Sequence, residues 1–429
     1  MTQLKASARS HDLWERAVVF ALTLVLTSSD ITLSMGPYIH WASFLMAVIL
    51  LLPFAFREFL LPVDVVEQIA QEQSTRTAPA RLPILLFLGA AYVPVLYGAP
   101  LASTLVAIGK LAAILLIGFP IIAARVRLAL SAFYGLVFGV WINFALMLTG
   151  ILLGGPAASL KSPGRWGTVL NYPGALWRLG ITCWMFALYL CIRRFSIWSF
   201  SLLLVSTSLV YLDGARTALL LLAVGGGYVI ASLGLRGRRP VKIILIGLSV
   251  VVLFVTISEG MFSQQDGAIA RMVKTVSSVA ASGGDGFGAA DIARFTMLQD
   301  VITAIHNHPV LGTGIGSTTT NTMAGPMVIH ISYLQIWADC GVAGFIGYVW
   351  LVWGWLPFLP EAINRIRHLA DARERAIYYN ALFLLVVFGL TGLFHPLSTE
   401  WAQWIPFIVP YGLIWHITHT HFRTTQSHA

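Results

Sequence analysis

Apolar runs of about 20 residues recur along the chain, and they limit its possible folds more than any other feature. A run of this length is enough to cross a hydrocarbon core about 30 Å thick. In lipid, backbone polar groups must be satisfied within the segment, so each run is expected to be a helix. A membrane β-barrel would need alternating residues, and runs such as LAAILLIGFPII do not alternate. The sequence therefore predicts an all-α integral membrane protein.

Composition supports this class. Hydrophobic residues make up 57% of the chain and charged residues only 10%, whereas a soluble domain carries about 25% charged residues. The net charge of +9 could suggest nucleic acid, but the excess falls in short loops, where membrane topology favours it. The three cysteines have neither CxxC nor Cys/His spacing, so we expect no disulfide framework and no zinc site. No cofactor, metal or nucleic-acid partner is predicted.

About twelve membrane spans are expected, and no cleavage site follows the first, so it is expected to be retained. The expected spans are residues 17–34, 39–56, 82–97, 101–123, 128–152, 175–192, 197–212, 217–235, 243–258, 332–356, 377–394 and 404–420. Between them, residues 154–174 and 361–375 are expected to be loops.

Twelve spans place both ends of the chain on one side. Of the 27 lysines and arginines, nineteen then fall on that side and seven on the other, while Lys110 lies within a span. Positive residues favour the cytoplasm, so residues 259–329 are expected to face the periplasm. The chain divides into N-terminal spans (1–258, about nine), a periplasmic catalytic loop (259–329) and C-terminal spans (330–429, about three).

Residues 291–334 are polar and rich in glycine, although apolar runs surround them. They begin with an expected short amphipathic helix, for which Asp291 is a plausible N-cap and which Pro309 stops. Gly312, Gly314 and Gly316 predict a turn after it. The predicted apolar stripe of this helix is Ile292, Phe295, Leu298, Ile302 and Ile305.

Two arginines are candidates for binding a diphosphate, because a guanidinium fork matches phosphate oxygens. Arg294 lies in the amphipathic helix, and the alternative is a surface pair with Asp291 or Asp300. Arg216 follows a turn and precedes an apolar run, where an arginine is costly without a partner. Its alternative is a pair with Asp213 or a lipid headgroup. Arg271, in the same periplasmic stretch, is a further substrate-binding candidate.

His330 lies where the polar stretch meets the next span, and an imidazole can take a proton from a hydroxyl. The alternative is an interfacial histidine bonded to a carbonyl. Asp30, near the outer end of the first span, is the other acid–base candidate, and Tyr333 and His308 are candidates for binding substrate. His306 and His308 have no further ligand at metal spacing, and GTGIG follows a helix rather than the strand that a nucleotide loop requires.

His395, Glu400 and Trp401 lie at the expected outer face between the last two spans. They could line a sugar site with the tryptophan as a stacking platform, although interfacial tryptophans are common.

Together these pieces resemble a known family. An arginine after a short turn, an arginine-led amphipathic helix, HPVLGTGIGS and then HISYLQIWADCGVAGF are similar to the signature region of the O-antigen ligase and polymerase superfamily. The clear likeness covers residues 293–345. Members commonly have an asparagine after the histidine, whereas this chain has Ile331.

The resemblance implies a metal-independent GT-C-type glycosyltransferase of the bacterial inner membrane, with its active site facing the periplasm. Its donor would be an oligosaccharide on undecaprenyl diphosphate and its acceptor a growing glycan, with membrane lipid around it. A flippase and a chain-length co-polymerase are possible partners. By position, Arg216 and Arg294 would hold the diphosphate and His330 would be the general base.

Within this superfamily, we expect a Wzy-type polymerase of lipid-linked repeat units, with xanthan-type exopolysaccharide polymerases as a natural subgroup. The alternatives are an O-antigen ligase acting on lipid A–core and, from another class, a transporter or flippase. A transporter should carry charged or broken helices near the midplane, whereas here the polar residues gather outside the spans.

Overall fold

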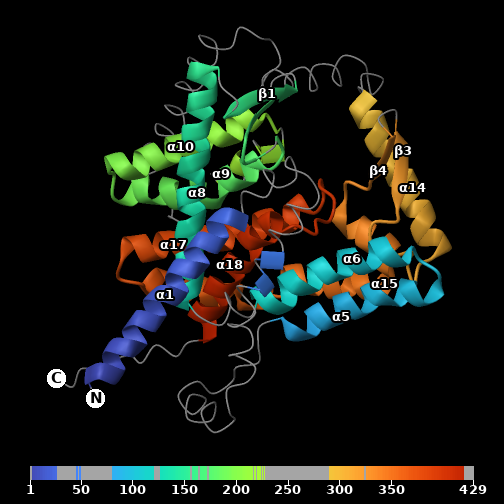
Figure 1. Cartoon of the computed structure of the whole chain (residues 1–429), viewed down its shortest axis with the longest axis horizontal. Helices are drawn as coiled ribbons and strands as arrows, with labels where there is room; N and C mark the ends of the chain where they lie inside the picture. Colours follow the sequence, from blue (N-terminus) through green and yellow to red (C-terminus); the bar gives the residue numbers. More distant parts are fainter. Residues whose placement is uncertain are drawn as a thin grey trace.

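The computed structural model describes most of the chain as helix (Figure 1). The described residues are 2–26, 45–46, 48–49, 80–119, 126–154, 157–162, 165–171, 173–215, 217–218, 220–223, 225, 227, 289–322 and 325–419.

The elements fall into helices, shorter helical turns and two small hairpins. The helices are α1 (Thr2–Leu26), α5 (Arg81–Tyr92), α6 (Leu101–Ala112), α8 (Val126–Leu153), α9 (Leu176–Arg193), α10 (Ile197–Asp213), α14 (Ala289–Asn307), α15 (Ser332–Trp353), α16 (Leu359–His368), α17 (Ala372–Thr391) and α18 (Trp401–His419). The helical turns are η1 (Val93–Tyr97), η2 (Ala113–Gly118, a π-helix) and η3 (Leu356–Phe358). The strands are β1 (Ala158–Ser162) paired with β2 (Arg165–Thr168), and β3 (Thr319–Thr322) paired with β4 (Gly325–Val328), both antiparallel.

Five helical stretches of the described chain are long and apolar enough to cross a membrane. They are Leu101–Gly118, Val126–Leu153, Leu176–Arg193, Ser332–His368 and Ala372–Thr391. The all-α membrane class is therefore supported. The count of twelve stays a prediction, because the expected spans 39–56, 217–235 and 243–258 lie mostly or wholly outside the described residues.

Where expected spans are described, their positions agree with the helices. The expected span 175–192 corresponds to α9 and the span 197–212 to α10. Ser196 is the N-cap of α10. Its hydroxyl oxygen accepts a hydrogen bond from Ser199 N, and the Ser199 hydroxyl oxygen accepts one from Ser196 N. Gly214 ends α10 in the left-handed conformation, with φ 71°. Local signals thus fix both ends.

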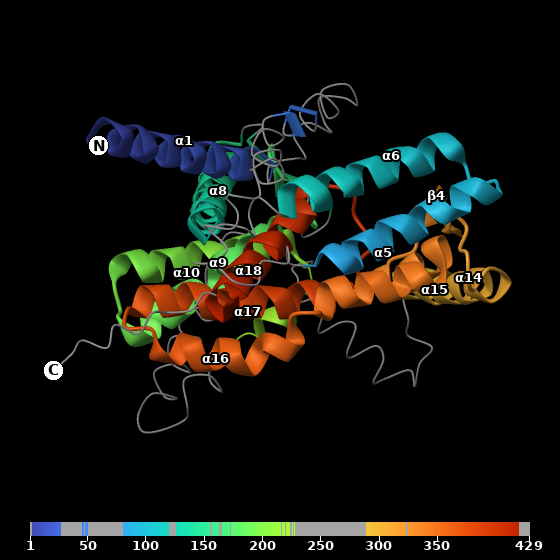
Figure 2. The same cartoon turned by 90° about the horizontal axis from the view of Figure 1, so that it is seen from below.

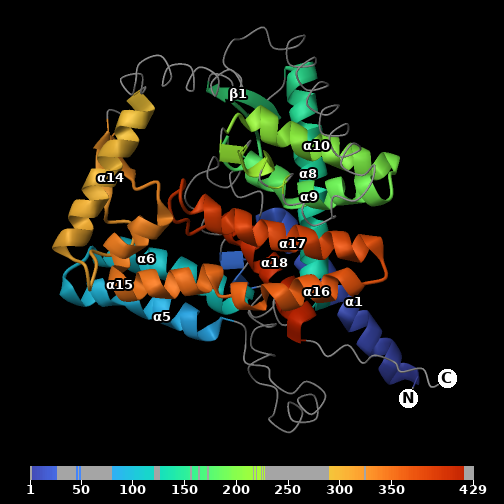
Figure 3. The ribbon, with the colours of Figure 1, turned by 180° about the vertical axis from the view of Figure 1, so that it is seen from behind.

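The helices pack into two neighbouring groups. In one, α9 lies between α10 and α17, and α17 packs on α18 (Figure 2). In the other, α5 packs between α6 and α15. The α5–α15 approach is close, because a Cβ at Gly347 would lie 2.7 Å from the backbone N of Phe87. The α14 helix and the β3–β4 hairpin form one edge of the molecule, beside α15 (Figure 3).

Two segments expected to be loops contain secondary structure. Residues 154–174 include the β1–β2 hairpin, whose short strands pair with each other. A second hairpin, β3–β4, which was not predicted, lies within residues 319–328. Residues 361–375 contain most of α16 rather than a loop. Its apolar side buries Ala362 and Ile366 while its charges remain outside, so a run without overall hydrophobicity is still helical.

Lys110, the charge expected within a span, forms an ion pair with Glu400. Its Nζ lies 2.8 Å from Glu400 Oε1, and the Lys110 side chain is only 10% exposed. A partner of opposite charge is what a lysine at this depth requires. The pair joins α6 to the segment before α18.

Candidate active site

His330 lies at a bend between β4 and α15. Its neighbour Ile329 is fully buried, and Ile331 packs in the same apolar cluster with Met297 and Val301 of α14. His330 is not part of this cluster. Its side chain is half-buried.

The hydrogen bond of His330 defines its neutral tautomer. Nδ1 lies 2.9 Å from the carbonyl oxygen of Val328. A carbonyl can only accept, so Nδ1 carries the proton and Nε2 carries the lone pair. The alternative of a histidine bonded to a carbonyl is therefore observed. This hydrogen bond is compatible with His330 acting as a general base, because it uses only Nδ1 and leaves Nε2 as the proton acceptor.

The α14 helix forms the other wall of this region, and its prediction was right only in part. The helix begins at Ala289, so Asp291 is not its N-cap. Of the predicted apolar stripe, Leu298 and Ile305 pack against the buried cluster, whereas Phe295 and Ile302 are each 54% exposed. The buried side chains described in α14 are those of Met297 and Val301. Apolar residues occur all round this helix, so its local pattern could not select the face that the β4–α15 segment covers.

Arg294 lies in α14, the helix whose Met297 and Val301 pack in one cluster with Ile329, the neighbour of His330. The Arg294 side chain itself is outside the described residues. Asp300, one of its alternative partners, accepts a hydrogen bond from Thr320 Oγ1 at 2.7 Å, which ties β3 to α14.

The polar residues that follow His330 hold α15 in place. Ser332 donates its hydroxyl to the carbonyl of His395 at 2.6 Å. The amide oxygen of Gln335 accepts from Leu397 N at 2.8 Å. Tyr333 donates to the carbonyl of Gly389 and accepts from Trp353 Nε1, both at 2.8 Å. Its hydroxyl is thus engaged between helices, and its contact with substrate stays a prediction.

The glycine turn is confirmed, and it caps a break in α15. Gly312, Gly314 and Gly316 all have positive φ. The helix is kinked at Gly341, which exposes carbonyls of the preceding turn. Thr313 N and Gly314 N donate to the carbonyls of Ala338 and Asp339 at 3.0 and 2.7 Å.

The Asp339 carboxylate completes this arrangement. It is 1% exposed and accepts from Gly316 N at 2.8 Å and Thr318 N at 3.2 Å. The amides of GTGIGS therefore bind α15, which agrees with the interpretation that this segment is not a nucleotide loop.

A second buried carboxylate organises the turn before Arg216. Asp213 accepts from Arg165 Nη2 at 3.0 Å, Gly174 N at 2.6 Å and Trp177 N at 3.1 Å. Burial raises the pKa of the Asp213 carboxyl, and Arg165 and both amides oppose that rise. Asp213 thus joins the hairpin, the start of α9 and the end of α10. The structure places Arg165 on Asp213, whereas Arg216, the partner considered from the sequence, lies outside the described residues.

Asp213→Asn is expected to lower the free energy of unfolding by about 1–3 kcal/mol, because an amide NH₂ would face buried N–H donors. Thermal unfolding in detergent measures the change. The control is Glu361→Gln, which breaks the more exposed pair with Arg365 and should cost about 1 kcal/mol or less. Equal effects would contradict the structural role of Asp213.

The structure brings together only part of the predicted site. Arg216, Arg271 and Asp30 lie outside the described residues. His308 is exposed at the end of α14, next to Pro309, whose carbonyl accepts from Val342 N. That contact lies ten residues along α15 from Ser332, a rise of roughly 15 Å, so His308 is separated from His330.

At the second predicted surface, Glu400 pairs with Lys110. Trp401 is 3% exposed and packs against Gly118, which contradicts the alternative of an open stacking platform.

Sequence reasoning missed the structural roles of Ser332, Gln335 and Asp339. The available signal was their spacing at the start of an apolar helix, where a polar side chain needs a partner. Within the described residues, no group of three or more His, Cys, Asp or Glu could hold a metal ion.

Comparison with known proteins gives one family match. Residues 200–349 match a family model described as O-antigen ligase. The segment runs from α10 into α15 and contains the predicted catalytic and diphosphate-binding residues, but neither Asp30 nor the group 395–401. No curated protein matches the chain. The match confirms the resemblance to the O-antigen ligase and polymerase superfamily over residues 200–349.

Proposed function

We propose that this protein is a polymerase of the bacterial inner membrane. It joins oligosaccharide repeat units carried on undecaprenyl diphosphate into an exopolysaccharide or O-antigen chain at the periplasmic face. Members of the matched family are glycosyltransferase-like enzymes, which favours glycosyl transfer over a transporter or flippase.

The observation that supports the proposal most is the fixed tautomer of His330. Its Nδ1–H is bonded to Val328, so Nε2 has the lone pair that a general base needs. The buried Ile329 and the partly buried Ile331 hold the backbone on either side, so the ring has a defined position at the start of α15. Asp30 remains the alternative base.

The proposed reaction is a single displacement. His330 Nε2 takes the proton of an acceptor hydroxyl while the oxygen attacks the anomeric carbon of the donor. The bond from that carbon to the diphosphate oxygen breaks, and its electron pair leaves with the lipid diphosphate. Arg216 and Arg294, with Arg271 nearby, stabilise the charge that develops on the leaving group. Arg294 lies in α14, the helix that packs against the segment holding His330, which is consistent with this role.

Because guanidinium groups would supply the positive charge, the reaction is proposed to need no metal. Glycan extension by the purified protein is expected to be unchanged by excess EDTA, measured by gel analysis of products from a lipid-linked repeat unit. A loss of activity that Mg²⁺ or Mn²⁺ restores would contradict this.

The second candidate is a ligase that transfers finished glycan to lipid A–core, because the matched family model is described as O-antigen ligase. The two reactions share a donor and differ in the acceptor. A strain lacking the gene tests them. If the protein is the polymerase, only single repeat units should be made. If long chains still form on the lipid carrier and merely fail to reach lipid A, the polymerase proposal is wrong and the ligase is correct.

A further inference from the structure

A pocket lies where the ends of four helices meet. It is lined by residues of α9, both halves of α15, the end of α17, the segment 395–398 and the first turns of α18. Ser332, two residues after His330, is part of its wall. A smaller pocket adjoins it and shares Arg178, Gln403 and Pro406 as wall residues.

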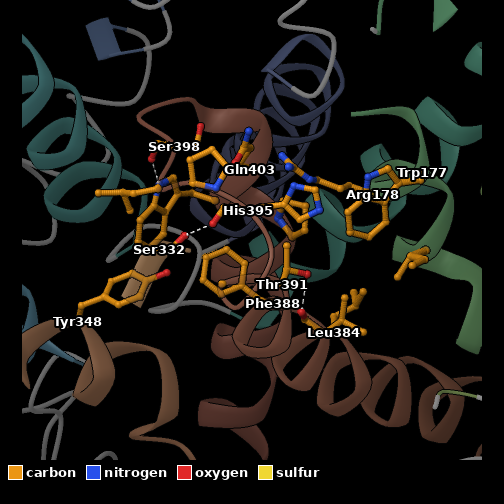
Figure 4. A pocket seen from close by; sticks show the side chains of 17 residues that line it. Trp177, Arg178, Ser332, Tyr348, Leu384, Phe388, Thr391, His395, Ser398 and Gln403 are labelled. Atoms are coloured by element: carbon orange, nitrogen blue, oxygen red, sulfur yellow. Dashed lines mark hydrogen bonds between the residues drawn. The ribbon is translucent and has the colours of Figure 1, made fainter. Parts of the chain in front are cut away.

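The pocket has a basic and polar side and an apolar side. Figure 4 shows Arg178, His395 and Gln403 on one side and Tyr348, Phe388 and Leu384 on the other. Neither pocket has an aspartate or glutamate among its described lining residues. The cavity volume is about 60 Å³, which favours a headgroup of phosphate size over an oligosaccharide.

Aromatic contacts orient the basic groups. The Arg178 guanidinium carbon lies 5.5 Å from the centre of the Trp177 ring, a cation–π distance. The His395 ring lies 5.6 Å from the same indole, and the His395 carbonyl accepts from Ser332. Trp177 is 1% exposed and therefore a rigid support. The polar side of the pocket is thus built from fixed parts.

We propose that this pocket binds a lipid with a phosphate or diphosphate headgroup, with Arg178 holding the phosphate oxygens and the hydrocarbon chain leaving along the apolar side. An arginine near the end of a membrane helix is favourable when it has an anionic partner, and its planar fork matches phosphate. This site is additional to the donor diphosphate site at Arg216 and Arg294. Lipid binding in this pocket does not depend on the proposed reaction.

The test is lipid binding by native mass spectrometry of the full chain, in a background carrying Arg216→Gln and Arg294→Gln. The probes are a polyprenyl diphosphate, phosphatidylglycerol and inorganic diphosphate. Arg178→Gln should weaken binding of a lipid probe by about tenfold or more, since it removes charge-assisted hydrogen bonds. Arg178→Lys should weaken lipid binding less than Arg178→Gln does. Arg194→Gln is the matched control, because Arg194 follows the other end of α9 and lines neither pocket.

A second variant, in the opposite wall of the pocket, tests the same inference if Arg178→Gln does not fold. Thr391→Leu adds apolar volume from α17, where the Thr391 hydroxyl binds only the Val387 carbonyl of its own helix among the bonds described. It should weaken binding of the lipid probes with no change in thermal stability greater than that of Arg194→Gln.

The outcomes are distinct. Arg178-dependent binding of the polyprenyl probe alone supports a lipid-carrier headgroup, and dependence for both lipids supports a bilayer phospholipid site. Binding of inorganic diphosphate alone, or lipid binding unchanged in both Arg178→Gln and Thr391→Leu, overturns the inference. In a further outcome, the double variant Arg216→Gln and Arg294→Gln binds lipid as the wild type does, and Arg178→Gln then abolishes that binding. This result supports the pocket and contradicts the proposed role of Arg216 and Arg294 in holding the donor diphosphate.

Discussion

His330→Asn is expected to reduce glycan extension by about 10²- to 10⁴-fold, the range for loss of a general base. Asparagine can place its side-chain NH₂ near the position of Nδ1 and keep the hydrogen bond to Val328, but it has no group in place of Nε2. The variant therefore separates loss of the base from loss of local structure. The measurement is the rate of extension by purified protein, with product length read from a gel.

The exposed His368 of α16 provides the control. His368→Ala should extend glycan at the wild-type rate. His368 precedes the start of α17, whereas Ser332 N donates to the Gly392 carbonyl at the other end of that 20-residue helix, a rise of roughly 30 Å. In cells, His330→Asn should cause flipped lipid-linked units to accumulate outside the membrane. Units trapped inside would favour transport instead. Extension by His330→Asn at more than a tenth of the wild-type rate would direct attention to Asp30 as the base.

Gly341→Ala is expected to prevent accumulation of folded protein, with a cost of at least about 3 kcal/mol. Gly341 has φ 68° and ψ −175°, a conformation that only glycine adopts readily. A Cβ at this position would overlap the carbonyl group of Val310. The alanine variant would have to separate α15 from the segment that ends at Gly312, and would lose the hydrogen bonds that cap the kink.

Fluorescence-detected size-exclusion chromatography in detergent measures this effect as loss of the monodisperse peak. The control is Gly89→Ala in α5, which has an exposed position and no atom within 4 Å of an added Cβ. That change should be neutral or slightly stabilising, since alanine favours helix by up to about 1 kcal/mol. A normal peak with an unchanged melting temperature for Gly341→Ala would show that the kink is not required.

The two variants report on different parts of the same motif. His330→Asn leaves the α15 packing intact and should yield folded, inactive protein. Gly341→Ala disrupts the contact between α15 and the glycine turn and should yield little protein. The signature HISYLQIWADCG therefore combines one residue proposed for chemistry with several that fix a broken helix.

The sequence by itself determined the membrane class, the positions of α8, α9 and α10, the glycine turn at 312–316 and the family resemblance of residues 200–349. These features depend on apolar run length, local capping and left-handed glycines, all of which act over a few neighbouring residues. The tertiary structure alone decided which face of α14 is buried, that Asp213 binds Arg165, that Lys110 binds Glu400, and that Ser332 and Gln335 dock α15 on residues 395–397. Each of these pairs joins residues far apart in the chain, and a buried polar group takes whichever partner the packing brings within hydrogen-bond distance, which no local pattern specifies.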